Sequence, residues 1–171
     1  MKLPLHYYGS KILRMKAAPI TEITPEIRQL AYDMIETMNS MKAIGLAANQ
    51  VGQLVTIFVS TVEPDGSSQF GPNRIYINPR IVWYSSEKQY EQEGCMSIPK
   101  TYVYVERPMK MGIEAQDLDG NTFELELEGL GASNFCHEND HLNGVLHIDR
   151  IDPKQRREIE AKLKAIKKAY S

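Results

Sequence analysis

Two histidines that flank a glutamate, His137, Glu138 and His141, form the pattern His-Glu-x-x-His, the part of this chain best suited to chemistry. Residues four apart lie on one face of an α-helix, so the two imidazoles can bind one metal ion. Glu138 then leans toward a water molecule bound to that ion. The chain has only four His among 171 residues, so this spacing seldom arises by chance. The pattern predicts metal-assisted hydrolysis.

A third ligand is expected, because a catalytic metal site usually has three protein ligands and one open position. The segment also fits the longer metzincin pattern, in which His147 is the third ligand. That pattern needs a Met-turn downstream, but the 24 residues after His147 contain no Met. A thermolysin-type downstream ligand would have to be Glu158 or Glu160, both in a charged helical segment. We expect His147 to be a half-buried residue of an alternating segment instead.

Cys95 is the third candidate ligand and lies upstream, in the segment Glu-Gly-Cys-Met-Ser of residues 93–97. A thiolate is a strong donor to first-row metals, and Cys/His/His with an open position is an accepted catalytic set. Taken alone, a cysteine is more often a small buried apolar residue. The metal-site interpretation therefore requires the Cys95 sulfur within about 5 Å of both imidazoles.

A third segment, residues 45–52, is Gly-Leu-Ala-Ala-Asn-Gln-Val-Gly and alone predicts a tight loop before a strand. Together the three segments resemble the signature motifs of the peptide deformylases: G-Φ-G-Φ-A-A-x-Q, E-G-C-Φ-S and H-E-x-x-H, where Φ is apolar. Their order and spacing match, and the likeness extends from about residue 5 to residue 170. The resemblance implies a metal-dependent hydrolase that removes the N-formyl group from the formylmethionine of newly made polypeptides and releases formate.

The resemblance also implies a role for each matching residue. Cys95, His137 and His141 would hold one ferrous ion per chain, with Ni²⁺, Co²⁺ or Zn²⁺ as possible substitutes. Glu138 would take a proton from the attacking water and hand it to the leaving amine. The Gln50 side chain and the Met96 backbone N–H would bind the developing oxyanion, and Gly45 would pair with the substrate backbone. The pocket for the methionine side chain would be lined by Ile44, Leu130, Asn134 and the His137 ring.

The chain departs from the family pattern at several positions. Ala43 replaces the leading Gly of the first motif, and Cys136 stands where Gln is usual. We expect Cys136 to be a small buried residue, with metal-site tuning or oxidation sensitivity as the alternative. Residues 131–134, Gly-Ala-Ser-Asn, differ most: Gly131 costs about 1 kcal/mol of helix propensity, and Asn134 brings an amide to the methionine pocket. A catalytically weak or inactive deformylase-like metal-binding protein, and a metalloprotease, are therefore the alternative functions.

Length and composition predict one domain over residues 1–171, because 42% hydrophobic residues suffice for a full core. A net charge of -2 gives no overall attraction to nucleic acid or membranes. No apolar signal region opens the chain and no run of 18 apolar residues occurs. We therefore expect a cytoplasmic monomer without a membrane contact, whose two Cys do not form a disulfide.

The expected fold class is α+β, with antiparallel β-sheets packed around a central metal-binding helix and with an N-terminal and a C-terminal helix, as in the family that the chain resembles. The cap Thr24, Pro25 and apolar residues at helical spacing predict a helix over residues 25–41. The helix that carries the His-Glu-x-x-His pattern is expected over residues 130–143, and Asp152-Pro153 begins a last helix over 153–169. The predicted strands are residues 55–59, 75–78, 102–105, 109–115 and 122–127, with a loop over 63–73.

The last helix is basic, because seven Lys or Arg and only two Glu follow Asp152. Ile159, Leu163 and Ile166 recur on one side, which predicts an amphipathic helix packed on the domain with a solvated basic face. A further hypothesis is that this face contacts ribosomal RNA, where formylated nascent chains emerge.

Overall fold

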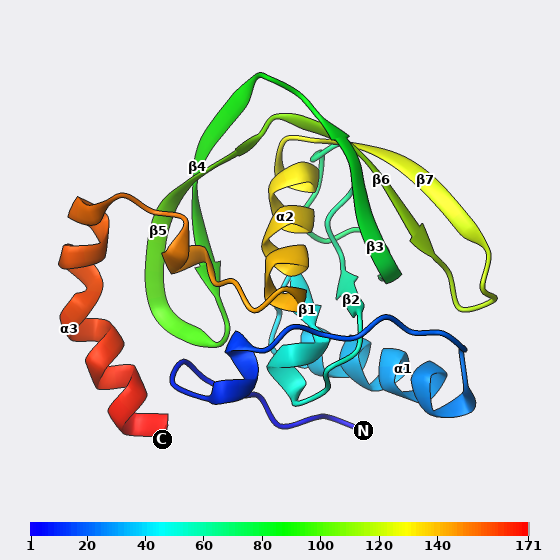
Figure 1. The fold of residues 1–171 in the computed structure, drawn as a ribbon, viewed down its shortest axis with the longest axis horizontal. Coiled ribbons are helices and arrows are strands. Elements are labelled where there is room, and N and C mark those ends of the chain that lie inside the picture. Colours follow the sequence, from blue (N-terminus) through cyan, green and yellow to red (C-terminus); the bar gives the residue numbers. More distant parts are fainter. Residues whose placement is uncertain (171) are drawn as a thin grey trace.

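The computed structural model describes residues 1–170, which form two antiparallel sheets and three α-helices (Figure 1). The five-stranded sheet has the order β1-β2-β3-β6-β7, and β4 and β5 form a separate two-stranded sheet. The central helix α2 lies between the two sheets in Figure 1, so the expected α+β architecture is confirmed. The bounds are α1 Pro25–Ser40, α2 Leu130–Leu142, α3 Pro153–Tyr170, β1 Gly45–Ala47, β2 Ile57–Ser60, β3 Arg74–Tyr84, β4 Lys88–Cys95, β5 Ile98–Pro108, β6 Lys110–Gln116 and β7 Thr122–Glu128.

Helix α1 begins where the sequence predicts, because Thr24 accepts a hydrogen bond from the Ile27 N–H at 3.2 Å and Pro25 occupies the first turn. The methionines on its inner face belong to the hydrophobic core, since Met34 and Met38 are fully buried against the first two strands. The helix therefore covers the β1–β2 end of the large sheet, along the lower edge of the molecule in Figure 1.

Strand β4 is absent from the sequence prediction, and β5 is longer than the predicted 102–105. The inward side chains of β4 include Gln89 and Glu93, so the strand lacks the apolar alternation by which strands are recognised. Strand β1 was missed as well, because Gly45–Ala47 is too short and too small in its side chains to form a periodic signal. The predicted strand 55–59 is shifted, since Val55 makes only an isolated bridge with Ala18.

Gly131, in the first turn of α2, is explained by its surroundings. A Cβ atom there would collide with the backbone carbonyl of Pro64, and that carbonyl accepts the Glu128 N–H at 2.9 Å. The predicted loop over 63–73 therefore packs directly on the start of α2. Gly131 lowers the helix propensity of α2, but it is the residue that permits this close backbone contact.

Helix α3 packs through Ile159 and Leu163 onto a core cluster that also contains Val103 and Ile148. The expectation for His147 was wrong: the residue is fully buried rather than half-buried, and it begins a short 3-10 turn, His147–Asp149, rather than continuing an alternating strand. None of the helices in residues 1–170 has the length and apolar character needed to cross a bilayer.

Candidate metal centre

Helix α2 and the end of β4 bring the three expected ligands together. One donor atom from each of Cys95, His137 and His141 lies within 4.8 Å of the other two, and the Cys95 sulfur is 3.4 Å from His141 Nε2. The requirement of about 5 Å set by the sequence is therefore met. His147 is not part of this group, because its Nε2 lies 3.2 Å from the Thr101 carbonyl oxygen and donates a hydrogen bond to it.

The chemistry of this donor set fits a borderline first-row metal. A sulfur and two ring nitrogens lie at one place, and burial lowers the pKa of His141 well below its usual value, which favours the neutral ligand form. Hydrogen bonds to Cys95 and Glu93 outweigh burial and raise the pKa of His137. A cation held here would displace that proton, as metal binding at histidine requires.

Glu93 orients the first histidine. His137 Nδ1 lies 2.9 Å from a Glu93 carboxylate oxygen and donates to it, which leaves Nε2 for a metal. Arg107 binds the same carboxylate through two hydrogen bonds, at 2.9 and 3.0 Å. Burial raises the pKa of Glu93, but the hydrogen bonds from His137 and Arg107 outweigh it and lower the value to about 2. Glu93 is therefore a carboxylate that fixes the ring of a ligand.

Arg107 also joins the hairpin to α2. It donates to Asp140 at 2.7 Å, and Arg150 donates to the other Asp140 oxygen at 2.9 Å. We call Glu93, Arg107, Asp140 and Arg150 the Arg107 cluster. Asp140 thus forms salt bridges with two arginines and is not part of the group of Cys95, His137 and His141. Arg107 was not singled out from the sequence, although it continues the buried alternation of Val103 and Val105 along β5.

Glu138 lies on α2 between the two histidines, and its carboxylate lies against Gly45 of β1. Its side chain is almost fully buried, and Oε1 has no hydrogen-bond partner. Burial raises the pKa of this carboxyl to about 7. A carboxylate with that pKa can both accept and return a proton near neutral pH.

Gly45, on the edge strand β1, lies directly against Glu138. A Cβ atom at Gly45 would lie 2.8 Å from Glu138 Cδ and 2.9 Å from Asn134 Nδ2, with a Glu138 oxygen closer still. Only glycine leaves this face of the strand open. Strand β1 pairs with β2 on one side alone, so its other edge presents backbone groups that a peptide could pair with.

Gln50 and Met96 lie near the sulfur. The Gln50 oxygen accepts the Ala47 N–H at 2.9 Å, while its nitrogen donates to Ser97 Oγ at 3.0 Å and lies 3.7 Å from the Cys95 sulfur. Met96 and Ser97 form the turn between β4 and β5. Ser97 was not identified from the sequence as a partner of Gln50, although it belongs to the same five-residue motif as Cys95.

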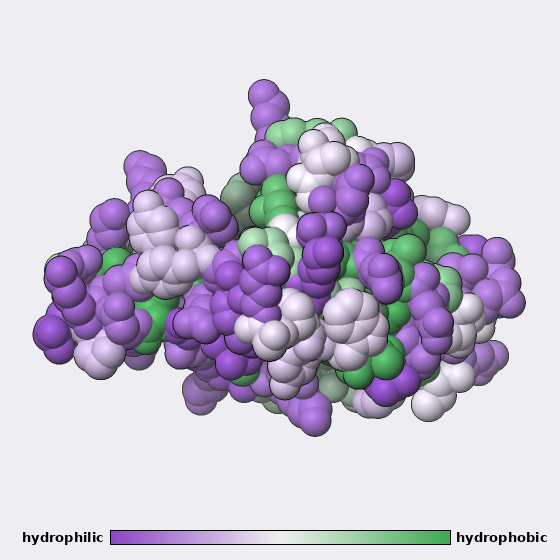
Figure 2. All heavy atoms as spheres, turned by 90° about the horizontal axis from the view of Figure 1, so that it is seen from above, coloured by the Kyte–Doolittle hydropathy of each residue, from purple (hydrophilic) through white to green (hydrophobic). Residues whose placement is uncertain are grey.

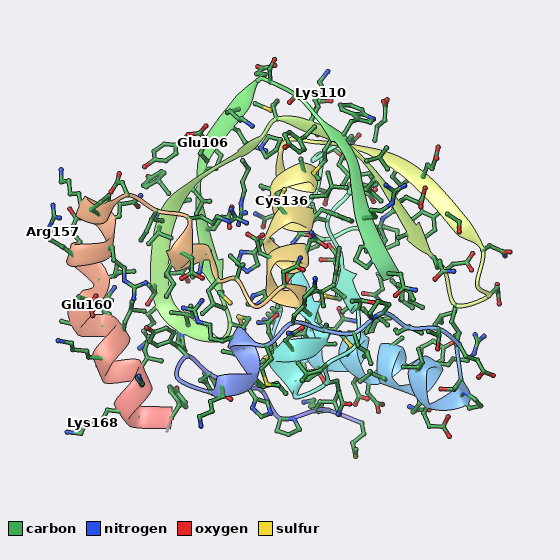
Figure 3. All side chains as sticks on the ribbon, viewed as in Figure 1. Glu106, Lys110, Cys136, Arg157, Glu160 and Lys168 are labelled. Atoms are coloured by element: carbon green, nitrogen blue, oxygen red, sulfur yellow. The ribbon has the colours of Figure 1, made fainter. Side chains whose placement is uncertain are left out.

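The expected pocket residues lie around the same helix face. Asn134 is buried and accepts a hydrogen bond from Ser60 Oγ at 2.7 Å. Ile44 and Leu130 are half-buried; Ile44 directly precedes β1, and Leu130 is the first residue of α2. Cys136 projects from α2 (Figure 3) toward Met111, with 3.7 Å between their sulfur atoms, and burial raises its pKa to about 11. Cys136 is thus the small buried residue expected, and both cysteines are free thiols.

Comparison with known proteins places this arrangement in a family context. The family profile described as "Polypeptide deformylase" matches residues 2–157. A peptide deformylase of Psychrobacter arcticus is 45% identical over 149 residues, which cover 87% of this chain and 79% of that protein. One from Rhodopseudomonas palustris is 46% identical over 149 residues, covering 85% and 83% of the two chains.

Solved structures agree with this likeness. A crystal structure of a plant peptide deformylase superposes with a TM-score of 0.91 at 36% identity, covering 98% of this chain and 90% of the plant chain. The peptide deformylase of Thermotoga maritima has a TM-score of 0.82 at 38% identity, with coverage of 90% and 99%. Sequence and fold thus lead to the same group of proteins.

Proposed function

Because the chain belongs to the polypeptide deformylase family, we propose that it hydrolyses the N-formyl group from the formylmethionine of newly made polypeptides and releases formate. The observation that carries the proposal is the convergence of the Cys95 sulfur and two imidazoles beside the buried carboxylate of Glu138. The family is metal-dependent, and the Cys/His/His set is suited to a first-row metal with an open position.

Ferrous iron is the metal we propose, with Ni²⁺, Co²⁺ or Zn²⁺ able to replace it. Cys95, His137 and His141 would hold one ion per chain. Such an ion, when bound, supplies a Lewis acid that polarises a carbonyl oxygen and makes water more acidic. Because all three ligands come from one chain, a monomer completes the site.

Glu138 is the proposed general base. It takes a proton from the attacking water as the water oxygen bonds to the formyl carbon, and it then gives the proton to the amine nitrogen as the C–N bond breaks. Its burial and its pKa near 7 support this exchange. The products are formate and a free N-terminal methionine.

The developing oxyanion is bound by hydrogen-bond donors beside Cys95. The Gln50 carboxamide is held at both ends, because its oxygen accepts the Ala47 N–H and its nitrogen donates to Ser97 Oγ, and the Met96 backbone N–H lies in the adjacent turn. Donors fixed before the reaction stabilise the transition state because little reorganisation is needed. Gln50 and Met96 are therefore assigned to the oxyanion rather than to the leaving group.

Substrate recognition uses the free edge of β1. The peptide backbone pairs with Gly45 as an added strand, so most of the binding energy is independent of sequence. The first side chain enters a pocket formed by Ile44, Leu130, Asn134 and the ring of His137. This mode suits an enzyme whose substrates share only their first residue.

The test is formate release from formyl-Met-Ala-Ser by iron-loaded protein under anaerobic conditions. Glu138→Ala should lower kcat by about 10²- to 10⁴-fold, the usual contribution of a general base, while metal content stays at one ion per chain. Cys95→Ser should lower the metal content itself, measured by elemental analysis. Met15→Ala, at an exposed position, is the control.

Two other results would contradict the proposal. Metal binding without formate release would indicate a deformylase-like binding protein without activity. Cleavage of internal peptide bonds in an unformylated peptide would indicate a metalloprotease.

The basic face of α3 is proposed to dock on ribosomal RNA, which would place the enzyme in the cytoplasm beside emerging chains. Figure 2 shows a largely hydrophilic surface at the α3 end of the molecule, and Figure 3 shows Arg157 and Lys168 pointing away from the body. Removing α3 would expose the core residues that Ile159 and Leu163 cover, among them Val103 and Ile148, so charge neutralisation is the cleaner test.

The triple variant Arg157→Gln, Lys164→Gln, Lys168→Gln should weaken ribosome binding about tenfold or more and flatten its salt dependence. The matched control neutralises three exposed lysines elsewhere, Lys42, Lys88 and Lys110. Equal binding by both variants would exclude α3 as the contact.

A further inference from the structure

Asn134 presents an unused hydrogen-bond donor beside the reacting groups. The residue is 92% buried, since its exposed fraction is 8%, and within residues 1–170 its carboxamide makes one hydrogen bond, through Oδ1 to Ser60. The nitrogen makes none, and it is not among the fully enclosed side-chain atoms that lack a partner, unlike Glu138 Oε1. The Asn134 nitrogen is therefore a donor without a protein partner that is not completely enclosed.

The orientation of this amide follows from its neighbours. Asn134 Nδ2 and a Glu138 carboxylate oxygen both lie near the point where a Gly45 Cβ atom would be. The opposite orientation would bring the amide oxygen to the carboxylate, which is electrostatically unfavourable. An amide nitrogen carries two N–H bonds, so one can face Glu138 and the other remains for a substrate.

The position of Asn134 along α2 indicates which part of a substrate it meets. Asn134 lies four residues before Glu138, slightly more than one helical turn or about 6 Å along the axis, on the side away from His141. Five bonds separate a formyl carbon from the δ-atom of the first side chain, a distance on the order of 5–6 Å. With the formyl carbon at Glu138, the δ-atom of that side chain reaches Asn134.

We infer that Asn134 is a specificity-determining residue that favours formylated peptides whose first side chain carries a hydrogen-bond acceptor at the δ-position, in particular the sulfoxide of methionine. This inference rests on the proposed function. The sulfoxide oxygen accepts a hydrogen bond strongly, the thioether of methionine accepts one weakly, and norleucine accepts none. A buried donor that meets norleucine stays unpaired, and that costs binding energy.

The test compares kcat/KM for three peptides: formyl-Met-Ala-Ser and the same peptide with methionine sulfoxide or norleucine first. The unaltered protein should use the sulfoxide peptide at least as well as the norleucine peptide. In Asn134→Leu, which keeps the shape and removes the donor, the sulfoxide-to-norleucine ratio should fall about five- to tenfold, the effect of one neutral hydrogen bond. Ser60 keeps a partner in this variant, because its hydroxyl also lies 3.1 Å from the Ile44 carbonyl oxygen.

Asn143→Leu makes the same chemical change at the exposed end of α2 and should leave the ratio unchanged. An unchanged ratio in Asn134→Leu overturns the inference and leaves the proposed function intact. If Asn134→Leu does not fold, Asn134→Ala is measured in its place. The unaltered protein alone can also overturn the inference, if its kcat/KM for the sulfoxide peptide is tenfold lower than for the norleucine peptide. No formate from any of the three peptides overturns the proposed function and this inference together.

Discussion

The two sides of α2 are equally buried but are held by different forces. On one side Phe135 packs edge-on against Phe58 and Tyr76, with ring centroids 5.1 and 5.6 Å away. On the other side His141 and Glu138 are just as buried, yet their neighbours are carboxylates, amides and a thiol. Apolar packing stabilises the first side directly, whereas the second is stabilised only while its charges stay paired.

The Arg107 cluster gives the largest expected effect on the polar side. Arg107→Ala leaves Glu93 and Asp140 buried without their main partner, and we expect a loss of about 3–5 kcal/mol in the free energy of unfolding. Metal affinity should fall as well, because Glu93 orients His137. Urea denaturation and metal titration measure the two effects.

The control for Arg107 is Arg80→Ala. Arg80 on β3 forms an exposed ion pair with Glu114 on β6, and its loss should lower the free energy of unfolding by about 1 kcal/mol or less. Equal effects of the two substitutions would mean that the polar side of α2 contributes no more than a surface pair.

On the apolar side, Phe135→Ala should cost about 3 kcal/mol, because it opens a cavity between Phe58 and Tyr76. The metal affinity of the folded protein should change little, since no donor atom loses a hydrogen bond. Phe70→Ala, at an exposed position, is the control. A strong loss of metal affinity in Phe135→Ala would show that the geometry of the polar side of α2 depends on packing on the apolar side.

Cys136 lies on the apolar side although it precedes a ligand in sequence. Cys136→Ala should cost about 1 kcal/mol through its lost contact with Met111 and should leave metal affinity unchanged. Its raised pKa also predicts slow alkylation in the native protein. Altered metal affinity would instead support tuning of the site by the Cys136 sulfur.

The smallest expected effect lies outside α2, at the half-exposed pair of Arg14 and Asp149. Burial raises the pKa of Asp149, but hydrogen bonds from Arg14 and the Leu146 N–H outweigh it, so the pKa lies below its ordinary value of 3.8. The stability from this carboxylate is therefore fully present above that value and is lost as the pH falls through the lower, folded-state pKa. Asp149→Asn should lower the free energy of unfolding at about pH 7 by less than about 1 kcal/mol, which is seen as a slightly lower Tm. The decrease in Tm should be smaller at about pH 3. An equal Tm difference at both pH values would contradict this account.

The same contrast explains what the sequence could predict. Helix 25–41 was placed within one residue, because Thr24 and Pro25 give a start signal and its apolar residues repeat at helical spacing. Helix 130–143 was placed equally closely from the His-Glu-x-x-His pattern, which needs both histidines on one helix face. Strand β4 was missed because the residues it turns inward are polar and bond to backbone carbonyls or to charged groups instead of packing against apolar neighbours. Glu93 is one such residue, and its partner Arg107 lies fourteen positions away.

The grouping of Cys95, His137 and His141 was predictable because metal binding needs fixed residue types at fixed spacings, as His137 and His141 show. Glu93 and Arg107 have no such constraint on their own, so their parts in the site emerge only when β4 and β5 are paired. Once Cys95 is accepted as a ligand at the end of a strand, side-chain alternation would place Glu93 on the same face.

Cys95 and His141 are 46 positions apart in the chain, and they come from different layers of the fold. A cation that binds both therefore crosslinks the hairpin to the helix and restricts the unfolded chain as a disulfide of similar span would. Chelation should consequently speed hydrogen exchange in β4 more than in β2, because only β4 is tethered through the ion. An ion at this site would then stabilise the fold in addition to its part in the reaction.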